Sequence, residues 1–230
     1  MTNKPLDYIK SNLEKRKRVE NTLHGRDLVV VVNPLPEHIN IDSVLRRVEN
    51  YVPSSLTQEI DAIYIGEFKL LQQRSIQALY YHGTIYLTNE QDDENDMLDD
   101  LVHEIAHAAE SLKKDKIYGD GSLQEEFLIK RRKMLDILLE IGYDIDKKSM
   151  LSPDFDQELD NFFYWEVGYE RLDNLINGIF ISPYSITSLR EYWAKGFEAY
   201  ALGNKTELQE VSPILYKKLE TVYLDAYEGA

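Results

Sequence analysis

The chain has 230 residues, of which 43% are hydrophobic and 16 are tyrosine, and this is the composition of a folded globular protein. Its formal net charge of −15 argues against nucleic acid or an anionic membrane as the main partner, and is compatible with a basic substrate. Because the chain has no cysteine, a disulfide scaffold, a cysteine-ligated zinc site and a thiol nucleophile are all excluded.

From the sequence we expect neither a classical signal peptide nor a membrane span. The opening residues, MTNKPLDYIK, lack the apolar stretch of a signal peptide. The longest aliphatic run, LVVVV at 28–32, is far too short to cross a bilayer. We therefore expect a soluble protein that is either cytoplasmic or exported without a classical signal peptide.

The first part of the chain alternates between helical and extended patterns. Apolar spacing and turn residues predict a helix over 5–24, a strand over 27–33, a helix over 41–52, a strand over 60–68 and two strands over 76–89 that turn at His82-Gly83. Helical patterns follow almost without interruption, over 93–116, 123–142, 155–178, 187–203 and 212–227. The sequence thus predicts an α+β fold, in which an α/β lobe over 1–92 with a small mixed sheet and a helical lobe over 93–230 form one two-lobed domain.

Several charged clusters have an ordinary structural explanation. The basic runs KRKR at 15–18 and KRRK at 130–133 lie in predicted helices of an acidic chain, so we expect solvated helix faces rather than nucleic-acid sites. The acidic run over 90–100 lacks the glycine and the spaced ligands of a calcium loop, and is typical of a helix start. The isolated histidines are expected to be surface or turn residues; they are His24, His38 and His82.

The other two histidines of the chain form a motif with Glu104. The stretch DDLVHEIAHAAE, at 99–110, places His103 and His107 four residues apart. On an α-helix these two side chains lie on one face and can share a ligand. This is the H-E-x-x-H pattern, in which two imidazoles hold zinc and the carboxylate activates water. In a chain of this composition, chance would give the pattern only about 0.01 times.

A catalytic zinc site needs a third protein ligand. The extended pattern H-E-x-x-H-x-x-G-x-x-H requires glycine at 110 and histidine at 113, but the chain has Glu110 and Lys113. Metzincins are therefore excluded, and a carboxylate from a later helix remains as the source of the ligand.

The segment SPYSITSLREYWAKGFEAYALG, at 182–203, resembles the metallopeptidases of the anthrax lethal factor and Pro-Pro endopeptidase type. In that family the H-E-x-x-H helix is followed by a helix with Glu, two aromatic residues and Ala, and a Tyr lies seven residues before this Glu. Here Glu191 begins EYWA, and Tyr184 stands seven residues earlier. The resemblance implies a zincin-like fold, Glu191 as the third zinc ligand and Tyr184 as the residue that faces the developing oxyanion.

The resemblance covers about residues 60–110 and 180–203, less than half of the chain. The family commonly has an acidic residue four positions after the ligand Glu, where this chain has Lys195. Residues 111–180 contain an extra helical stretch that does not align with the family, and this stretch could cover the cleft, carry specificity or bind a partner. Glu198, two turns after Glu191 on the same helix face, is the alternative third ligand.

Together these features predict an endopeptidase with one Zn²⁺ per chain. Zinc would be held by His103, His107 and Glu191, Glu104 would act as general base, and Tyr184 would stabilise the oxyanion. An edge strand around 84–89 would pair with an extended peptide or protein substrate. Two alternatives stay open: a zincin-fold binding or assembly protein of a virus or toxin with little protease activity, and a metal-dependent hydrolase of a non-peptide amide.

Overall fold

The computed structural model describes residues 19–228 and has a mixed α+β fold, with a five-stranded sheet and many helices. It divides into two compact units, and the division falls between Ala109 and Glu110, inside helix α4 (Glu94–Tyr118). The lobe boundary predicted at 92/93 lies just before the start of this helix. Within the described residues, no helix combines the length and the apolar character that crossing a membrane requires.

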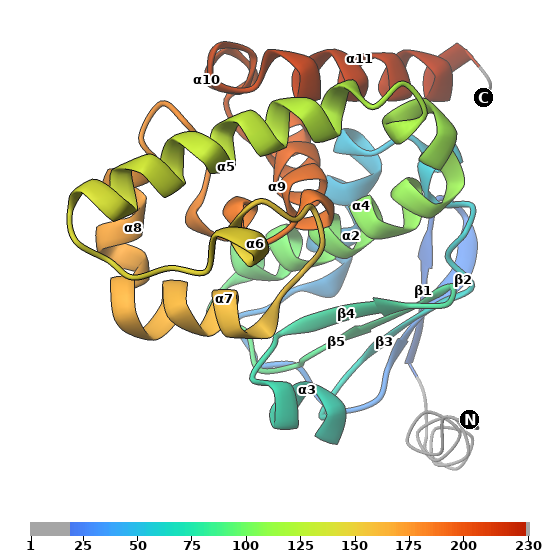
Figure 1. Cartoon of the computed structure of the whole chain (residues 1–230). Helices are drawn as coiled ribbons and strands as arrows, with labels where there is room; N and C mark the ends of the chain where they lie inside the picture. Colours follow the sequence, from blue (N-terminus) through green and yellow to red (C-terminus); the bar gives the residue numbers. More distant parts are fainter. Residues whose placement is uncertain (1–18, 229–230) are drawn as a thin grey trace, which may run out of the picture. The chain divides into compact units, whose positions relative to one another are not determined.

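Unit 1 is built around the sheet, whose strand order is β1-β2-β3-β5-β4 (Figure 1). The three inner strands are parallel to one another, and the first and last strands pair antiparallel at the two edges. The strands are β1 (Val19–Leu23), β2 (Arg26–Val31), β3 (Ala62–Ile65), β4 (Ala78–Tyr81) and β5 (Thr84–Leu87). Strands β2 and β5 carry continuous runs of buried residues, whereas β3 alternates buried Ile63 and Ile65 with half-buried Ala62 and Tyr64.

The first edge strand corrects the helix predicted over 5–24. Residues 19–23 pair with β2 across a tight turn in which His24 and Gly25 have φ of 52° and 72°. Such a two-residue turn with positive φ favours a hairpin, and pairing with a long apolar strand outweighs the helical propensity of the charged residues. The remainder of that prediction, with the basic run at 15–18, lies outside the described residues.

The second edge strand also differs from the expectation. The predicted hairpin is present, and His82 and Gly83 form its turn with φ of 44° and 79°. However, β5 lies between β3 and β4, so the edge strand is β4 rather than the segment around 84–89. All four residues of β5 are buried, whereas those of β4 are only half-buried. Burial of Ile85 and Leu87 against the core explains why the second arm of the hairpin takes the inner place.

The helices of unit 1 are α2 (Ile41–Tyr51), the short η1 (Ser54–Thr57) and α3 (Lys69–Arg74), and the part of α4 up to Ala109. The two long helices, α2 and α4, each bury a stripe of apolar side chains, as the spacing of these residues in the sequence predicts. The carboxylate of Glu94 accepts hydrogen bonds from Asn40 N–H at 3.0 Å and Ser43 Oγ at 2.8 Å. Glu94, the first residue of α4, thus accepts hydrogen bonds from the N-terminal end of α2. These bonds fix the position where α4, the helix that carries the two histidines, begins.

Unit 2 is helical. Its long helices are α5 (Ser122–Glu140), α9 (Leu189–Leu202) and α11 (Pro213–Glu228), which pack against one another (Figure 1). Shorter elements connect them: α6 (Lys147–Met150), α7 (Gln157–Asn161), the π-helical η2 (Phe162–Val167), α8 (Tyr169–Ile176), η3 (Pro183–Ile186) and α10 (Lys205–Val211). The single helix predicted over 155–178 is wrong, because Gly168 adopts φ of 81° and divides it. Helices α3, α6 and α10 were not expected from the sequence.

The basic run at 130–133 is not the solvated face that the sequence suggested. Lys130 and Arg131 are buried within unit 2. The ammonium group of Lys130 donates to the carbonyl oxygens of Ile179 and Val211, and Arg131 donates to backbone oxygens that include that of Ser152 at 2.5 Å. These two cations donate hydrogen bonds to backbone carbonyl groups at the ends of neighbouring segments, which would otherwise be buried without a partner. The sequence alone does not show that such carbonyl groups lie nearby.

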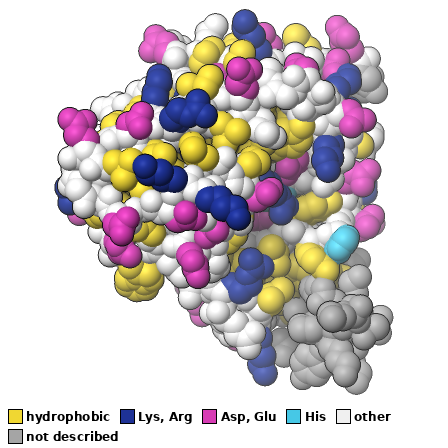
Figure 2. Space-filling view, viewed as in Figure 1, with side chains coloured by type: hydrophobic (Ala, Val, Ile, Leu, Met, Phe, Trp, Pro, Cys, Tyr) yellow, Lys and Arg dark blue, Asp and Glu magenta, His cyan; other side chains and the backbone are white. Residues whose placement is uncertain are grey.

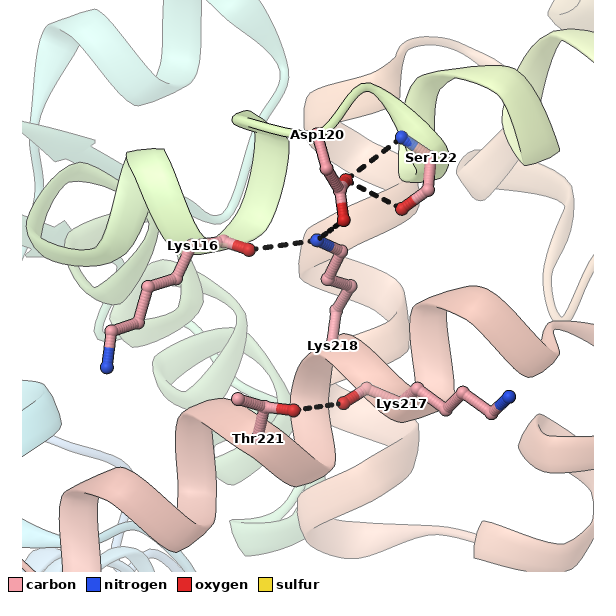
Figure 3. Close-up of polar contacts among 6 residues, drawn as sticks. All are labelled: Lys116, Asp120, Ser122, Lys217, Lys218 and Thr221. Carbon is pink, nitrogen blue, oxygen red and sulfur yellow. Dashed lines mark hydrogen bonds and ion pairs between the residues drawn. The ribbon is translucent and has the colours of Figure 1, made fainter.

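The end of α4 is joined to α11 by a polar cluster (Figure 3). Lys218 donates to the carbonyl oxygen of Lys116 at 3.0 Å and to the carboxylate of Asp120 at 2.9 Å. Asp120 also accepts from the N–H and the hydroxyl of Ser122, at 3.0 and 2.7 Å. The hydrogen bond from Lys218, followed by those from Ser122, lowers the pKa of Asp120. This cluster fixes the turn between α4 and α5.

Candidate metal centre

The two histidines of the motif lie on α4, one turn apart. His107 is buried and His103 is half-buried, and their ring centroids are 4.9 Å apart at an interplanar angle of 87°. The neighbouring residues Leu101, Val102 and Ile105 are buried in unit 1 and hold this part of the helix against the core. The i, i+4 spacing thus brings the two imidazoles together, as expected for a shared ligand.

Glu104 contacts the edge strand of the sheet. Its Oε2 accepts a hydrogen bond of 2.5 Å from the backbone N–H of Tyr80, and the side chain is buried. Thr88 N–H donates to the carbonyl oxygen of Gln77, so Ala78 and Tyr80 direct their backbone groups away from β5, towards the edge. The Glu104 carboxylate therefore lies at the free edge of β4, where the backbone of an additional strand would form hydrogen bonds.

Glu191 occupies the first turn of α9. Ser188 caps this helix, and its Oγ accepts a hydrogen bond from the N–H of Glu191 at 3.1 Å. A carboxylate in the first turn is favoured by the helix dipole.

Helix α9 is tightly held within unit 2. The hydroxyl of Tyr192 donates to Oε1 of Glu126 on α5 at 2.8 Å, and Glu126 also accepts from the N–H groups of Ile214 and Leu215 at the start of α11. A Cβ atom at Gly196 would lie 2.4 Å from Cδ2 of Leu215, so α9 and α11 approach closely at this glycine. These contacts fix the position of α9, and with it the first helical turn, which carries Glu191.

The structure brings three of the predicted residues together. The ligand atoms of His103, His107 and Glu191 all lie within 4.8 Å of one another, and this is the only group of its kind found among the described residues. Two imidazole nitrogens and one carboxylate oxygen are the protein ligand set of many catalytic zinc sites. Glu198, the alternative ligand, instead forms an ion pair of 2.7 Å with Lys195. The residues present thus fit a zinc ion.

Further charged groups surround Glu191 within unit 2. Glu110, three residues after His107, accepts from the guanidinium Nε of Arg190 at 3.2 Å and from the hydroxyl of Tyr118 at 2.8 Å. Burial, and then the carboxylate of Glu110, raise the pKa of Tyr118, and Glu191 adds to this shift. Arg190 directly precedes Glu191, so its ion pair helps to orient the first turn of α9. No sequence motif identifies Glu110 or Arg190.

Asp160 of α7 also interacts electrostatically with Glu191. Burial raises the pKa of Asp160, the hydrogen bond from Tyr169 partly offsets this, and the Glu191 carboxylate raises it further. Glu191 thus lies among several carboxylates of its own unit, which a cation bound at this position would stabilise.

Tyr184 lies in η3, directly before α9. Pro183 opens this turn, and Ser182 and Ser185 form a reciprocal capping box around it. The side chain of Tyr184 is half-buried. The backbone is thus well defined, whereas the role of the hydroxyl at the metal stays a prediction.

Comparisons with models of protein families, with characterised proteins and with solved structures find no match to this chain. The function therefore has to be inferred from the residues of the site, from their geometry and from the motif that they form.

Proposed function

We propose that the protein is a zinc-dependent endopeptidase with a zincin-like arrangement of its site. The observation that carries this proposal is the meeting of His103, His107 and Glu191, with Glu104 beside the two histidines. A purely structural zinc ion would not need an adjacent carboxylate that is not a ligand. The position of Glu104 at the edge of a sheet supports a substrate that binds as an extended chain.

Zinc, when bound by these three residues, would polarise a carbonyl group and make water more acidic. Oε2 of Glu104 is occupied by the N–H of Tyr80, so Oε1 is the oxygen that accepts the proton of the attacking water. The same carboxyl group then passes this proton to the leaving amine. The hydroxyl of Tyr184 would donate a hydrogen bond to the carbonyl oxygen of the substrate as negative charge develops there.

The edge strand would bind the substrate backbone, and this can be tested at Ala78. Its N–H is directed away from β5, so Ala78→Pro removes one donor to an added strand without removing a hydrogen bond of the sheet. We expect KM to rise roughly 2- to 12-fold, the value of one net hydrogen bond, with kcat little changed. Steady-state kinetics measures both, and an unchanged KM would show that the substrate does not pair with β4 at this residue.

The metal is tested by elemental analysis of the purified protein. We expect close to one zinc per chain, and loss of zinc in His107→Ala, because a catalytic zinc site uses three protein ligands and this variant keeps only two. Glu191→Gln should also lose zinc, whereas Glu198→Gln should keep it. The opposite result for the two glutamate variants would assign the third ligand to Glu198. Absence of any transition metal after reconstitution with zinc would refute the proposed site.

The activity is tested with a peptide library and mass spectrometry. The zinc-loaded protein should cut internal peptide bonds at a defined sequence, and a chelator should stop the reaction until zinc is restored. No cleavage by fully zinc-loaded protein would refute the peptidase. It would favour either the binding or assembly protein or the non-peptide amidase that the sequence leaves open.

A further inference from the structure

Two large aromatic side chains are exposed next to each other in unit 2. Trp165 is 76% exposed and Tyr164 is 50% exposed, and their rings meet edge to face with centroids 4.5 Å apart. Tyr164 also meets Tyr169 edge to face at 5.6 Å. We call these three residues the aromatic ridge. Hydrophobic side chains reach the surface around α7, at the lower left of Figure 2. Adjacent exposed aromatic side chains form a contiguous apolar surface, and surfaces of this kind often bind a partner.

The aromatic ridge stands on a fixed backbone. Phe162, Phe163 and Val167, which belong to the same π-helical turn, are buried. The N–H of Gly168 closes this turn with a hydrogen bond of 3.0 Å to the carbonyl oxygen of Phe163. Single π-helical turns are rare and frequently occur at functional sites. The exposed rings are therefore presented by an anchored segment and not by a loose chain end.

The aromatic ridge is linked to Glu191, within the same unit, through Asp160. The hydroxyl of Tyr169 donates to Oδ1 of Asp160 at 3.4 Å. Asp160 in turn experiences the charge of Glu191. A residue of a bound polypeptide could thus contact the ridge while a neighbouring part of the same polypeptide lies near the metal ligands.

The charge around the ridge selects the kind of side chain that it would bind. Residues 153–170 include six acidic residues and no Lys, Arg or His; the acidic residues are Asp154, Asp156, Glu158, Asp160, Glu166 and Glu170. The cation that follows directly, Arg171, is engaged by the ring and the hydroxyl of Tyr143. Asp156 is engaged as the N-cap of α7, and four of the others are exposed. Carboxylates repel an anionic side chain and contribute nothing to an apolar one. A cation gains from both the carboxylates and the aromatic faces, since Trp is the strongest cation–π partner.

We propose that the aromatic ridge is a binding subsite for an arginine or lysine side chain of the polypeptide that the metal site cleaves. The identity of this polypeptide as a substrate rests on the proposed function, whereas the binding chemistry of the ridge does not. The subsite lies in the part of the chain, 111–180, that has no counterpart in the family that the motif resembles.

Binding is tested in a Glu104→Gln background, so that turnover cannot interfere. The probes are dye-labelled alanine-based hexapeptide amides with one arginine, or with norleucine at the same position, and anisotropy reports their affinity. We expect the arginine peptide to bind more tightly, and Trp165→Ala to weaken it by about 2- to 30-fold, the range of a cation–π contact. The matched control is Tyr227→Ala, which removes an aromatic side chain of 61% exposure from α11 and should change nothing.

Tryptophan emission gives a second, direct readout. The chain has two tryptophans, and Trp193 is fully buried, so the neutral quencher acrylamide should act mainly on Trp165. The arginine peptide should protect Trp165 from acrylamide, and the norleucine peptide should not. Equal binding of both peptides, or no effect of Trp165→Ala, overturns the subsite.

Cleavage separates this proposal from the proposed function. In the wild-type background, a higher KM of Trp165→Ala for arginine-containing peptides, with kcat retained, supports both. A cation preference in binding without cleavage of any peptide overturns the peptidase and leaves the binding chemistry of the ridge supported. Cleavage without a basic preference, unchanged by Trp165→Ala, overturns the subsite alone.

Discussion

Replacing Glu104 with glutamine is expected to lower kcat by about 10²–10⁴ while zinc stays bound, since a positioned general base typically contributes this much. Glutamine keeps the shape of the side chain, and its amide oxygen can still accept the hydrogen bond from Tyr80 N–H. Only the basic oxygen that takes the proton from water is lost. Steady-state kinetics with the best library peptide, together with elemental analysis, measures both quantities.

Two further variants make this result specific. Glu104→Asp retains a basic oxygen but withdraws it by one methylene, so its kcat should lie between those of the wild type and the glutamine variant. Glu191→Gln should lose activity together with zinc. If Glu104→Gln turns over at the wild-type rate, or if it loses zinc, Glu104 is not the general base and the mechanism is wrong.

The part of the site on α4 could be predicted because it is local. His103, Glu104 and His107 lie within five residues, so their relative positions follow from helix geometry alone. The apolar spacing around them predicted the helix, and the structure confirms it from Glu94 through both histidines, with a kink further on at Lys113. Glu191 is far away in the sequence. Its proposed role came from the motif that it shares with a known family, and the approach of its carboxylate to the two histidines agrees with that role.

The contacts that complete the site depend on pairings between distant segments. The hydrogen bond from Tyr80 to Glu104 exists only because β4 is the edge strand, and the order of the strands cannot be read from their individual patterns. The same applies to β1, whose composition suggests a helix until its partner β2 is known. Arg190 and Glu110 are eighty residues apart in the sequence, and charged residues at such a separation carry no pairing signal.

The segment over 155–178 shows a different limit. Its apolar residues repeat at helical spacing, and most of it is helical, but the predicted continuous helix is interrupted at Gly168. An isolated glycine is tolerated in many helices, so its presence did not decide between a break and a continuation. The turn before Gly168 is π-helical, and Trp165 is exposed on it. The 3.6-residue period of a regular α-helix does not predict which side chains such a turn exposes.

Tyr184→Phe is expected to lower kcat by about 10²–10³, the typical cost of removing one donor to an oxyanion, and to change KM much less. Pro183 and the capping box of Ser182 and Ser185 fix the backbone of η3 without the hydroxyl, so folding and zinc content should stay unchanged. The donor acts on charge that develops in the transition state, and its loss therefore appears in kcat. Circular dichroism, elemental analysis and steady-state kinetics measure these three properties.

The matched control is Tyr51→Phe, which removes the same hydroxyl from a tyrosine that is exposed on α2 and should leave both kinetic constants unchanged. A competitive inhibitor that mimics the tetrahedral centre should bind more weakly to Tyr184→Phe by a factor similar to the loss in kcat, because such an inhibitor carries the oxyanion itself. A change in KM alone would place Tyr184 in a substrate pocket, and no change in either constant would place its hydroxyl away from the reacting carbonyl. Either result would remove Tyr184 from the mechanism and leave the metal ion as the source of oxyanion stabilisation.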